Sequence, residues 1–447
     1  MTEAHVNRNH AARWLLGLLL AALLIGSACT SDSKTQSSAP TATTSATAGP
    51  TLVPGDVITQ DKVLEKDPSV TKRAEVVWGA MFEQTGPLAG FGEPSFDGLK
   101  MAVQDINEDG GFQVGDTIYT IRLVERDTQS NVSQSIAVAT ELIQDHDVNV
   151  IWGPASVGDS ESTAITQRSE VLHLCPCPKR ELTTLSSEEK VRTQSRWAFQ
   201  TLSAPSKFLP PGARNTAAEH PEFDSFATIC VNSETGHAFC DYFTDAYEAA
   251  GFDHVGEVFF PDGTTDFRPF LTNLKADDPD IILNFTDAGI DQFTLLRDSV
   301  ALDVGRFYIA VALPYDLFES LVGGAGIRSK MVAAGAAPRN SAIYTSEDAR
   351  AFFEDKYKPF KGSGLPPGSF AAMLTYDPAF MLLAAMQRAG TVEDTTKIAE
   401  ALGEIHYSGY GEDDMYFDSR HLIVTGNDSC DIYQGRMTCE HIPPPPP

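Results

Sequence analysis

Two alternating patterns of apolar and polar positions run through the chain after residue 73. Short apolar runs are typical of buried strands, and segments with apolar residues every three or four positions are typical of helices. The first half predicts strands at 76–82, 117–127, 148–153 and 171–174, and helices that begin near 96, 133 and 160. Residues 84–94, rich in Gly and Pro, are predicted to form a loop.

The same alternation returns in the second half. Strands are predicted at 226–231, 254–260, 280–285 and 306–311, and helices at 238–251, 267–277 and 289–303. Repeated strand–helix units form parallel sheets with helices on both faces. Because there are too many units for one domain, we expect an α/β fold with two doubly wound parallel-sheet lobes.

The N-terminus has the pattern of an export signal. Arg8 and Arg13 precede the apolar run WLLGLLLAALLI, and Gly26-Ser27-Ala28 precede Cys29. This resembles the lipobox of bacterial lipoproteins, although Gly26 departs from its usual aliphatic residue. The resemblance implies a signal peptide at 1–28 and a lipid on Cys29, on the extracytoplasmic face of the bacterial cell membrane. An ordinary signal peptide that leaves a free thiol is the alternative.

Composition places two segments outside any core. Residues 30–50 contain mostly Ser, Thr, Ala and Pro and no large apolar residue. Such a segment cannot bury enough surface to offset its ordering entropy, so 29–73 is predicted to be a lipidated, disordered tether. The proline-rich tail 442–447 is also predicted to lie outside the lobes.

The net charge narrows the class of partner. The chain carries a formal net charge of -28, with 61 acidic residues against 33 basic ones. An acidic surface repels phosphate backbones, so nucleic-acid binding is not expected.

Export favours disulfide bonds. Of the seven cysteines, six remain if Cys29 carries lipid. Cys430 and Cys439 flank DIYQGRMT, which predicts a hairpin and a cross-strand disulfide. Cys230 and Cys240 are predicted to pair as well. The pairing of Cys175 and Cys177, with each other under strain or with a distant partner, stays open.

The stretch HLCPC, 173–177, has three interpretations. On an extended strand His173, Cys175 and Cys177 would share one face, as ligands of zinc or copper(I) would. Two prolines disrupt that alternation, and C-x-C does not fit the C-x-x-C pattern of redox pairs. A structural role in a loop is therefore favoured, and no metal or cofactor is expected.

Solutes of doubly wound sheets bind outside the carboxyl ends of the strands. The predicted strands therefore direct attention to the loops that follow them: 83–95, 153–160, 174–183, 231–237, 285–289 and 311–316.

Several motifs occur in one order along 75–440. The first contains Thr85-Gly86-Pro87, then Gly92, Gly98, Ala102, Ile106-Asn107 and Gly110-Gly111. VIWGPAS (150–156), WAFQT (197–201), GTTDFRPFLTNLKADDPDIIL (263–283) and YDPAFMLLAAMQRAGT (376–391) follow. This ordered set resembles the leucine/isoleucine/valine-binding family of substrate-binding proteins that serve ABC importers.

The resemblance implies a type I periplasmic binding protein fold with a three-segment hinge. Lobe 1 would hold 74–200 and 335–415, and lobe 2 would hold 201–334 and 416–441. A small polar or amino-acid-like solute would bind between the lobes and be passed to ABC permease subunits. A sensory receptor for a membrane signalling partner is the alternative, and a metallochaperone is less favoured. No catalytic motif is present, so the protein is not expected to be an enzyme.

The resemblance also implies the residues that contact solute. They are Phe91, Ser156, Val157, Pro178, Lys179, Thr235, Asp287 and Tyr315. The family's serine falls on Val157, with Ser156 one residue earlier. Its threonine is replaced near Lys179, whose cation could hold a carboxylate or phosphate, and its aromatic is lost at Thr235.

Two of these residues have a more specific expected role. Asp287 would take the ammonium partner role. Phe91 would lie over the solute, with ordinary lobe packing as the alternative. Since the usual hydroxyls are lost, the pocket is predicted to be rebuilt, and isoleucine is not expected to bind.

Overall fold

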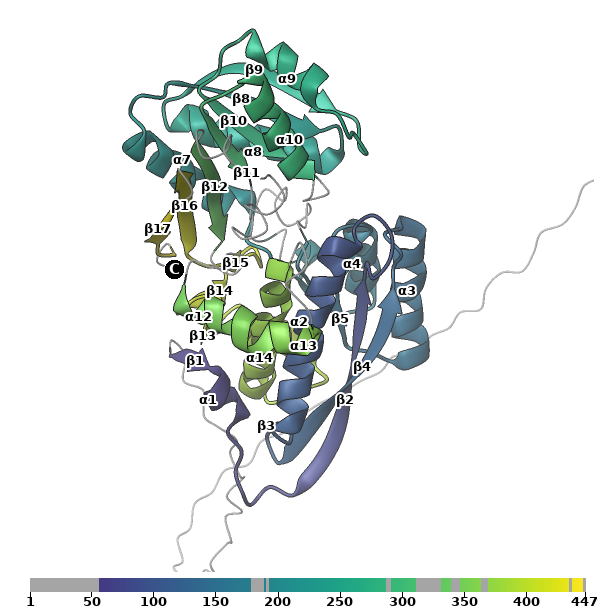
Figure 1. Ribbon diagram of the computed structural model, residues 1–447. Helices are drawn as coiled ribbons and strands as arrows, with labels where there is room; N and C mark the ends of the chain where they lie inside the picture. The colour runs from purple at the N-terminus through teal and green to yellow at the C-terminus, as the bar shows by residue number, and fades with distance from the viewer. Residues whose placement is uncertain are drawn as a thin grey trace, which may run out of the picture. The chain divides into compact units, whose positions relative to one another are not determined.

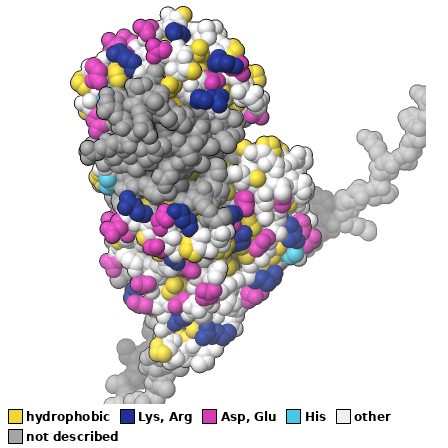
Figure 2. Space-filling view, viewed as in Figure 1, with side chains coloured by type: hydrophobic (Ala, Val, Ile, Leu, Met, Phe, Trp, Pro, Cys, Tyr) yellow, Lys and Arg dark blue, Asp and Glu magenta, His cyan; other side chains and the backbone are white. Residues whose placement is uncertain are grey.

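The computed structural model describes residues 56–177, 189, 193–286, 291–310, 331–338, 346–362, 369–433 and 436–444. Two large sheets and one small sheet organise this part of the chain (Figure 1). On the face shown in Figure 2, the described acidic and basic side chains are interspersed rather than gathered by sign.

The first large sheet has the strand order β3-β4-β2-β5-β6-β7. Its strands are β2 (Lys72–Phe82), β3 (Phe112–Val114), β4 (Thr117–Asp127), β5 (Val150–Trp152), β6 (Leu172–Cys175) and β7 (Ala198–Gln200). All pairs are parallel except β3 with β4. The predicted strands of the first half are therefore confirmed, and they pair as a doubly wound sheet requires.

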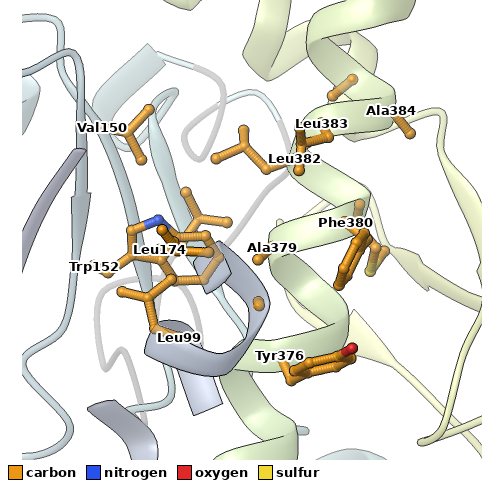
Figure 3. Packing of buried hydrophobic residues seen from close by; sticks show 14 of the residues in the cluster. Leu99, Val150, Trp152, Leu174, Tyr376, Ala379, Phe380, Leu382, Leu383 and Ala384 are labelled. Atoms are coloured by element: carbon orange, nitrogen blue, oxygen red, sulfur yellow. The ribbon is translucent and has the colours of Figure 1, made fainter. Parts of the chain in front are cut away.

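Helices cover both faces of this sheet. One face packs on α2 (Ala89–Glu108) and α14 (Met373–Ala389), and the other packs on α3 (Val132–His146) and α4 (Asp159–Arg168). Figure 3 shows Trp152 and Leu174 of the sheet near Leu99 of α2, with Leu382 of α14 pointing toward the sheet. All four side chains are fully buried, with 0% exposure. Burying each one contributes roughly 1.5–3 kcal/mol to the stability of the folded state.

The helix α2 begins earlier than predicted. It starts at Ala89 rather than near residue 96, so Pro94 lies inside it. Gly92 allows the first turn to approach the backbone of Glu83, because a Cβ there would overlap the Glu83 carbonyl oxygen. Tertiary packing therefore extends the helix through a segment whose Gly and Pro content predicted a loop.

The second large sheet has the order β17-β16-β12-β11-β10-β8-β9. Its strands are β8 (Ser225–Val231), β9 (Asp253–Phe260), β10 (Ile281–Phe285), β11 (Phe307–Ala310), β12 (Met331–Pro338), β16 (Asn427–Tyr433) and β17 (Arg436–Ile442). Strands β8 to β12 are parallel, and the C-terminal hairpin β16–β17 adds antiparallel strands at one edge.

Helices also cover both faces of the second sheet. One apolar cluster joins it to α9 (Arg268–Lys275) and α10 (Asp291–Leu302), and another joins it to α7 (Pro205–Glu219) and α8 (Glu234–Ala249). This arrangement confirms the prediction of two doubly wound parallel sheets.

A small sheet corrects the predicted boundary of the tether. Strand β1 (Val57–Thr59) pairs with β13 (His406–Ser408), which leads on to β14 (Met415–Phe417) and β15 (Ile423–Val424). Helix α1 (Gln60–Leu64) follows β1 and buries Val63. The segment 57–64, predicted to belong to the tether, is ordered because its few apolar residues find partners far along the chain.

The remaining described elements are helical. It comprises α12 (Glu347–Ala351), a π-helical turn (Phe352–Tyr357), α13 (Lys358–Lys361), a 3-10 turn (Ser369–Ala372) and α15 (Thr395–Leu402). Within the described residues one segment, Ser369–Ala389, is long and apolar enough to cross a membrane. Since 94% of its most apolar stretch is buried inside the structure, this segment is a core helix.

Candidate functional site

The first sheet has its switch point between β2 and β5. The chain passes from β2 to β4 on one side and then to β5 on the other. The helices that follow β2 and β4, α2 and α3, cover opposite faces. At such a point the loops after neighbouring strands leave in opposite directions and open the crevice in which ligands bind. The segments that begin at Glu83 and Gly153 therefore form the candidate site.

A buried carboxylate joins these two segments. Glu83 follows directly after β2, and its Oε1 accepts the backbone N–H of Ser156 at 2.9 Å and of Val157 at 2.8 Å. Its Oε2 accepts the N–H of Ala155 at 2.9 Å. Burial raises the pKa of Glu83, and the N–H groups of residues 155–157 act against that rise. The carboxylate has 0% exposure, so these donors replace water around it.

Asp127 fixes the loop that carries Glu83. It ends β4, and its carboxylate accepts the N–H of Gln84 at 3.0 Å and the hydroxyl of Thr85 at 2.6 Å. Burial acts to raise the pKa of Asp127, but these hydrogen bonds lower it below its usual range. The Thr85 hydroxyl of the T-G-P motif is thus committed to the scaffold of the loop.

The structure describes three of the residues predicted to contact solute. Ser156 and Val157 are half-buried, and their N–H groups bind Glu83. Phe91 is half-buried and lies against Phe370, with 5.7 Å between ring centroids. Contact of these residues with a solute stays a prediction.

The other predicted contacts cannot be placed in the same way. Pro178, Lys179, Asp287 and Tyr315 lie outside the described residues. The backbone of Thr235 forms part of α8, whose first turn is capped by Ser233 Oγ accepting the N–H of Gly236 at 3.0 Å. The structure does not describe the side chain of Thr235.

His173 is a structural residue in the core of the first sheet. It has 0% exposure. Its Nε2 lies 2.5 Å from the carbonyl oxygen of Gly153, and its Nδ1 lies 3.1 Å from Oγ1 of Thr163. Both ring nitrogens are therefore used, and the carbonyl partner assigns the proton to Nε2.

One disulfide joins the two cysteines that follow His173. Cys175 pairs with Cys177, with 5.2 Å between their Cα atoms. Together with His173 this confirms a structural role for the HLCPC stretch. Among the described residues, no group of three or more His, Cys, Asp or Glu side chains is arranged to hold a metal ion.

The two predicted disulfide pairs lie in the second sheet and its helices. Cys230, the penultimate residue of β8, pairs with Cys240 of α8, as predicted. The strands β16 and β17 confirm the predicted hairpin, and their register places Cys430 opposite Cys439. The side chains of Cys430 and Cys439 are not described, so their disulfide stays a prediction. Cys29 also lies outside the described residues.

Glu83 is the site residue that sequence reasoning missed. The available signal was a carboxylate directly after the first buried strand, in an otherwise apolar and Gly-rich neighbourhood. That signal could not name its partners, because Ala155 lies 72 positions further along the chain.

The sequence is similar to a known protein family. Residues 76–426 match the periplasmic binding protein family. The curated relatives include Leu/Ile/Val-binding protein homolog 7 of Brucella suis, 27% identical over 216 residues, which are 47% of this chain and 52% of the relative. Homolog 8 of Brucella abortus is 24% identical over 220 residues, 47% of this chain and 51% of the relative. The chain spans about half the length of the curated relatives it matches.

Solved structures share the fold over a longer span. The branched-chain amino acid transporter substrate-binding protein LivJ of Streptococcus pneumoniae, in complex with isoleucine, has a TM-score of 0.66 at 20% identity. The match covers 83% of this chain and 100% of LivJ. An ABC transporter solute-binding protein of Rhodopseudomonas palustris, in complex with p-hydroxybenzoic acid, has a TM-score of 0.66 at 17% identity, covering 83% and 97%. With its family match and its two doubly wound sheets, the chain belongs to the periplasmic binding protein family and has the type I fold of the leucine/isoleucine/valine-binding proteins.

Proposed function

We propose that this protein is an extracytoplasmic solute-binding lipoprotein of an ABC importer. It captures a small polar or amino-acid-like solute and delivers it to permease subunits, without catalysing a reaction. The observation that carries the proposal is the family match over residues 76–426 together with two doubly wound sheets. Each sheet presents loops at the carboxyl ends of its parallel strands, where ligands of such sheets bind.

Binding would act through closure of the two lobes. We divide the chain into lobe 1 at 74–200 and 335–415 and lobe 2 at 201–334 and 416–441. A solute that contacts both lobes favours the closed state, because only a difference in affinity between two states shifts their populations. Solutes that raise the melting temperature should therefore also reduce the radius of gyration in solution scattering.

The membrane attachment follows from the N-terminal motif. Cleavage before Cys29 and lipidation of its thiol would hold the folded body on the outer face of the cell membrane. In cells fed radiolabelled palmitate, the wild-type protein should be labelled and Cys29→Ser should not. Release of the wild-type chain as an unlabelled, processed protein would show an ordinary signal peptide instead.

A thermal-shift screen tests the binding function. The panel contains amino acids, amides, urea, short peptides and aromatic acids. A ligand that binds only the folded state must raise the melting temperature, so at least one compound should do so, and millimolar isoleucine should not. No shift with any compound and unchanged scattering would contradict the proposal.

An uptake assay then tests the importer role. Deleting the gene should abolish uptake of the identified solute, and the Cys29→Ser chain should restore it poorly. If uptake stays intact while a response to the solute is lost, the protein is a sensory receptor rather than an importer component.

A further inference from the structure

The carboxylate of Glu83 stands where a bound solute is expected. It follows β2 directly, and its three donors follow β5, the neighbouring parallel strand across the switch point. The crevice outside the carboxyl ends of these strands is the general ligand position of doubly wound sheets. A side chain of the protein thus occupies part of the candidate site.

The donors form an anion-binding arrangement. We call the N–H groups of Ala155, Ser156 and Val157 the amide cradle. Three successive N–H groups that converge on one point form a concavity suited to anions. They lie 2.9, 2.9 and 2.8 Å from the two oxygens of Glu83, so the carboxylate of the protein itself fills the cradle.

Access to the cradle is closed by the same contact. Glu83 and Ala155 both have 0% exposure, and Gly92 packs against the backbone of Glu83. A solute carboxylate would have to displace a buried side chain with three hydrogen bonds. It would also meet a second negative charge nearby, because the displaced carboxylate remains on the same loop.

We propose that Glu83 is a specificity-determining residue. By filling the amide cradle it excludes carboxylates from this loop and selects solutes whose end at the first lobe is neutral or cationic, such as an amide, a polyol or an amine. This inference rests on the proposed solute-binding function and names the class of solute. A purely structural Glu83 would tie two loops together without influencing which solutes bind.

Acetate rescue tests whether the cradle is a carboxylate site. Glu83→Ala leaves the three N–H donors of the amide cradle without their acceptor, and acetate can replace the lost group. Sodium acetate at 50 mM should raise the melting temperature of Glu83→Ala by at least about 2 °C. Acetamide, or sodium chloride at equal ionic strength, should not, and the wild type should not respond. Absence of any acetate effect on Glu83→Ala would overturn the proposal.

Matched solutes test the selectivity. Benzoate with benzamide, and isoleucine with isoleucinamide, differ at the carboxylate alone. Glu83→Ala should bind the carboxylate member of a pair at least about 10-fold more tightly than the wild type does, with the amide member unchanged. Carboxylates that bind the wild type as tightly as Glu83→Ala would contradict the exclusion.

Asp280→Ala is the matched control for losing a buried carboxylate. Asp280 is 4% exposed and accepts the N–H of Asp224 at 3.0 Å, next to the amino end of β8. This variant should show no gain for benzoate or isoleucine. A gain equal to that of Glu83→Ala would mean that destabilisation alone admits carboxylates, which would overturn the assignment.

Amide exchange in the wild type keeps the proposal testable if Glu83→Ala does not fold. The N–H groups of 155–157 should exchange slowly without added carboxylate, and acetate should not slow them further. Glu83→Gln should speed exchange of at least one, because its amide group cannot accept from all three. Acetate that slows exchange in the wild type would show an open cradle. If no compound of the wider screen binds the wild type while acetate rescues Glu83→Ala, the proposed function fails and the chemistry of the cradle stands.

Discussion

The imidazole Nε2 of His173, in β6, lies 2.5 Å from the carbonyl oxygen of Gly153, which follows the neighbouring strand β5 in the core of the first sheet. His173→Phe keeps a ring but leaves this buried carbonyl without that donor, so the free energy of unfolding should fall by about 1–3 kcal/mol. Urea unfolding measures the change. His237→Phe, at an exposed histidine, should change stability by less than about 0.5 kcal/mol.

The same contact predicts the response to chelation. Since both nitrogens of His173 bind groups of the protein, EDTA should leave the melting temperature unchanged. A fall in melting temperature that zinc reverses would show that a metal contributes to the fold.

Asp377 predicts a pH dependence of stability. Burial raises its pKa to about 7, against the opposing N–H of Gly411, from an ordinary value of 3.8. Between these values the folded state holds a proton that the unfolded state has released, so this contribution to stability falls as pH rises from about 4 to about 7. Asp377→Asn should therefore gain stability over the wild type, by on the order of 2 kcal/mol, between pH 5 and pH 8.

Asp394→Asn is the control for that measurement. Asp394 caps α15, and its hydrogen bond with Lys397 lowers its pKa. Both its folded and unfolded states are ionised above pH 5, so its effect on stability should be the same at both pH values. An Asp377→Asn effect equally independent of pH would contradict the raised pKa.

Two glycines of α2 predict opposite effects of the same substitution. A Cβ on Gly98 would overlap the carbonyl oxygen of Ala372 and lie 2.6 Å from Oγ1 of Thr375, whereas a Cβ on Gly90 would meet nothing within 4 Å. Gly98→Ala should destabilise the protein by about 1–3 kcal/mol, because α2 and α14 must separate. Gly90→Ala should stabilise it by about 0.4–1 kcal/mol through helix propensity and chain entropy. Equal effects in thermal unfolding would contradict this close approach.

The register of the C-terminal hairpin predicts a disulfide. Cys430 and Cys439 are directly paired positions of β16 and β17. Mass spectrometry of an unreduced digest of exported protein should find the two peptides linked. Replacing both cysteines by Ser should lower the free energy of unfolding by about 2–3 kcal/mol, as for closure of a short loop. Two free thiols in the exported protein would contradict the prediction.

Helix α7 shows where sequence patterns were insufficient. Pro210 and Pro211 lie inside it, and such residues argue against a helix in local terms. Phe208 and Leu209 are 2% and 3% exposed in the cluster beneath the second sheet. Burial of these side chains outweighs local propensity, as it does in the Gly- and Pro-containing first turns of α2.

The sequence by itself determined the repeated strand–helix units, the two parallel sheets and the family, but not helix α7 or the small sheet. Apolar periodicity and the order of motifs are local properties of the chain, and they are visible wherever a strand or helix buries one face. Only the tertiary structure decided that the carboxylate of Glu83 accepts hydrogen bonds from the N–H groups of 155–157 and that His173 binds the carbonyl oxygen of Gly153. It also decided that residues 57–59 pair with 406–408. These contacts join distant segments, and strand pairing and helix packing bring them together in ways that no local pattern encodes.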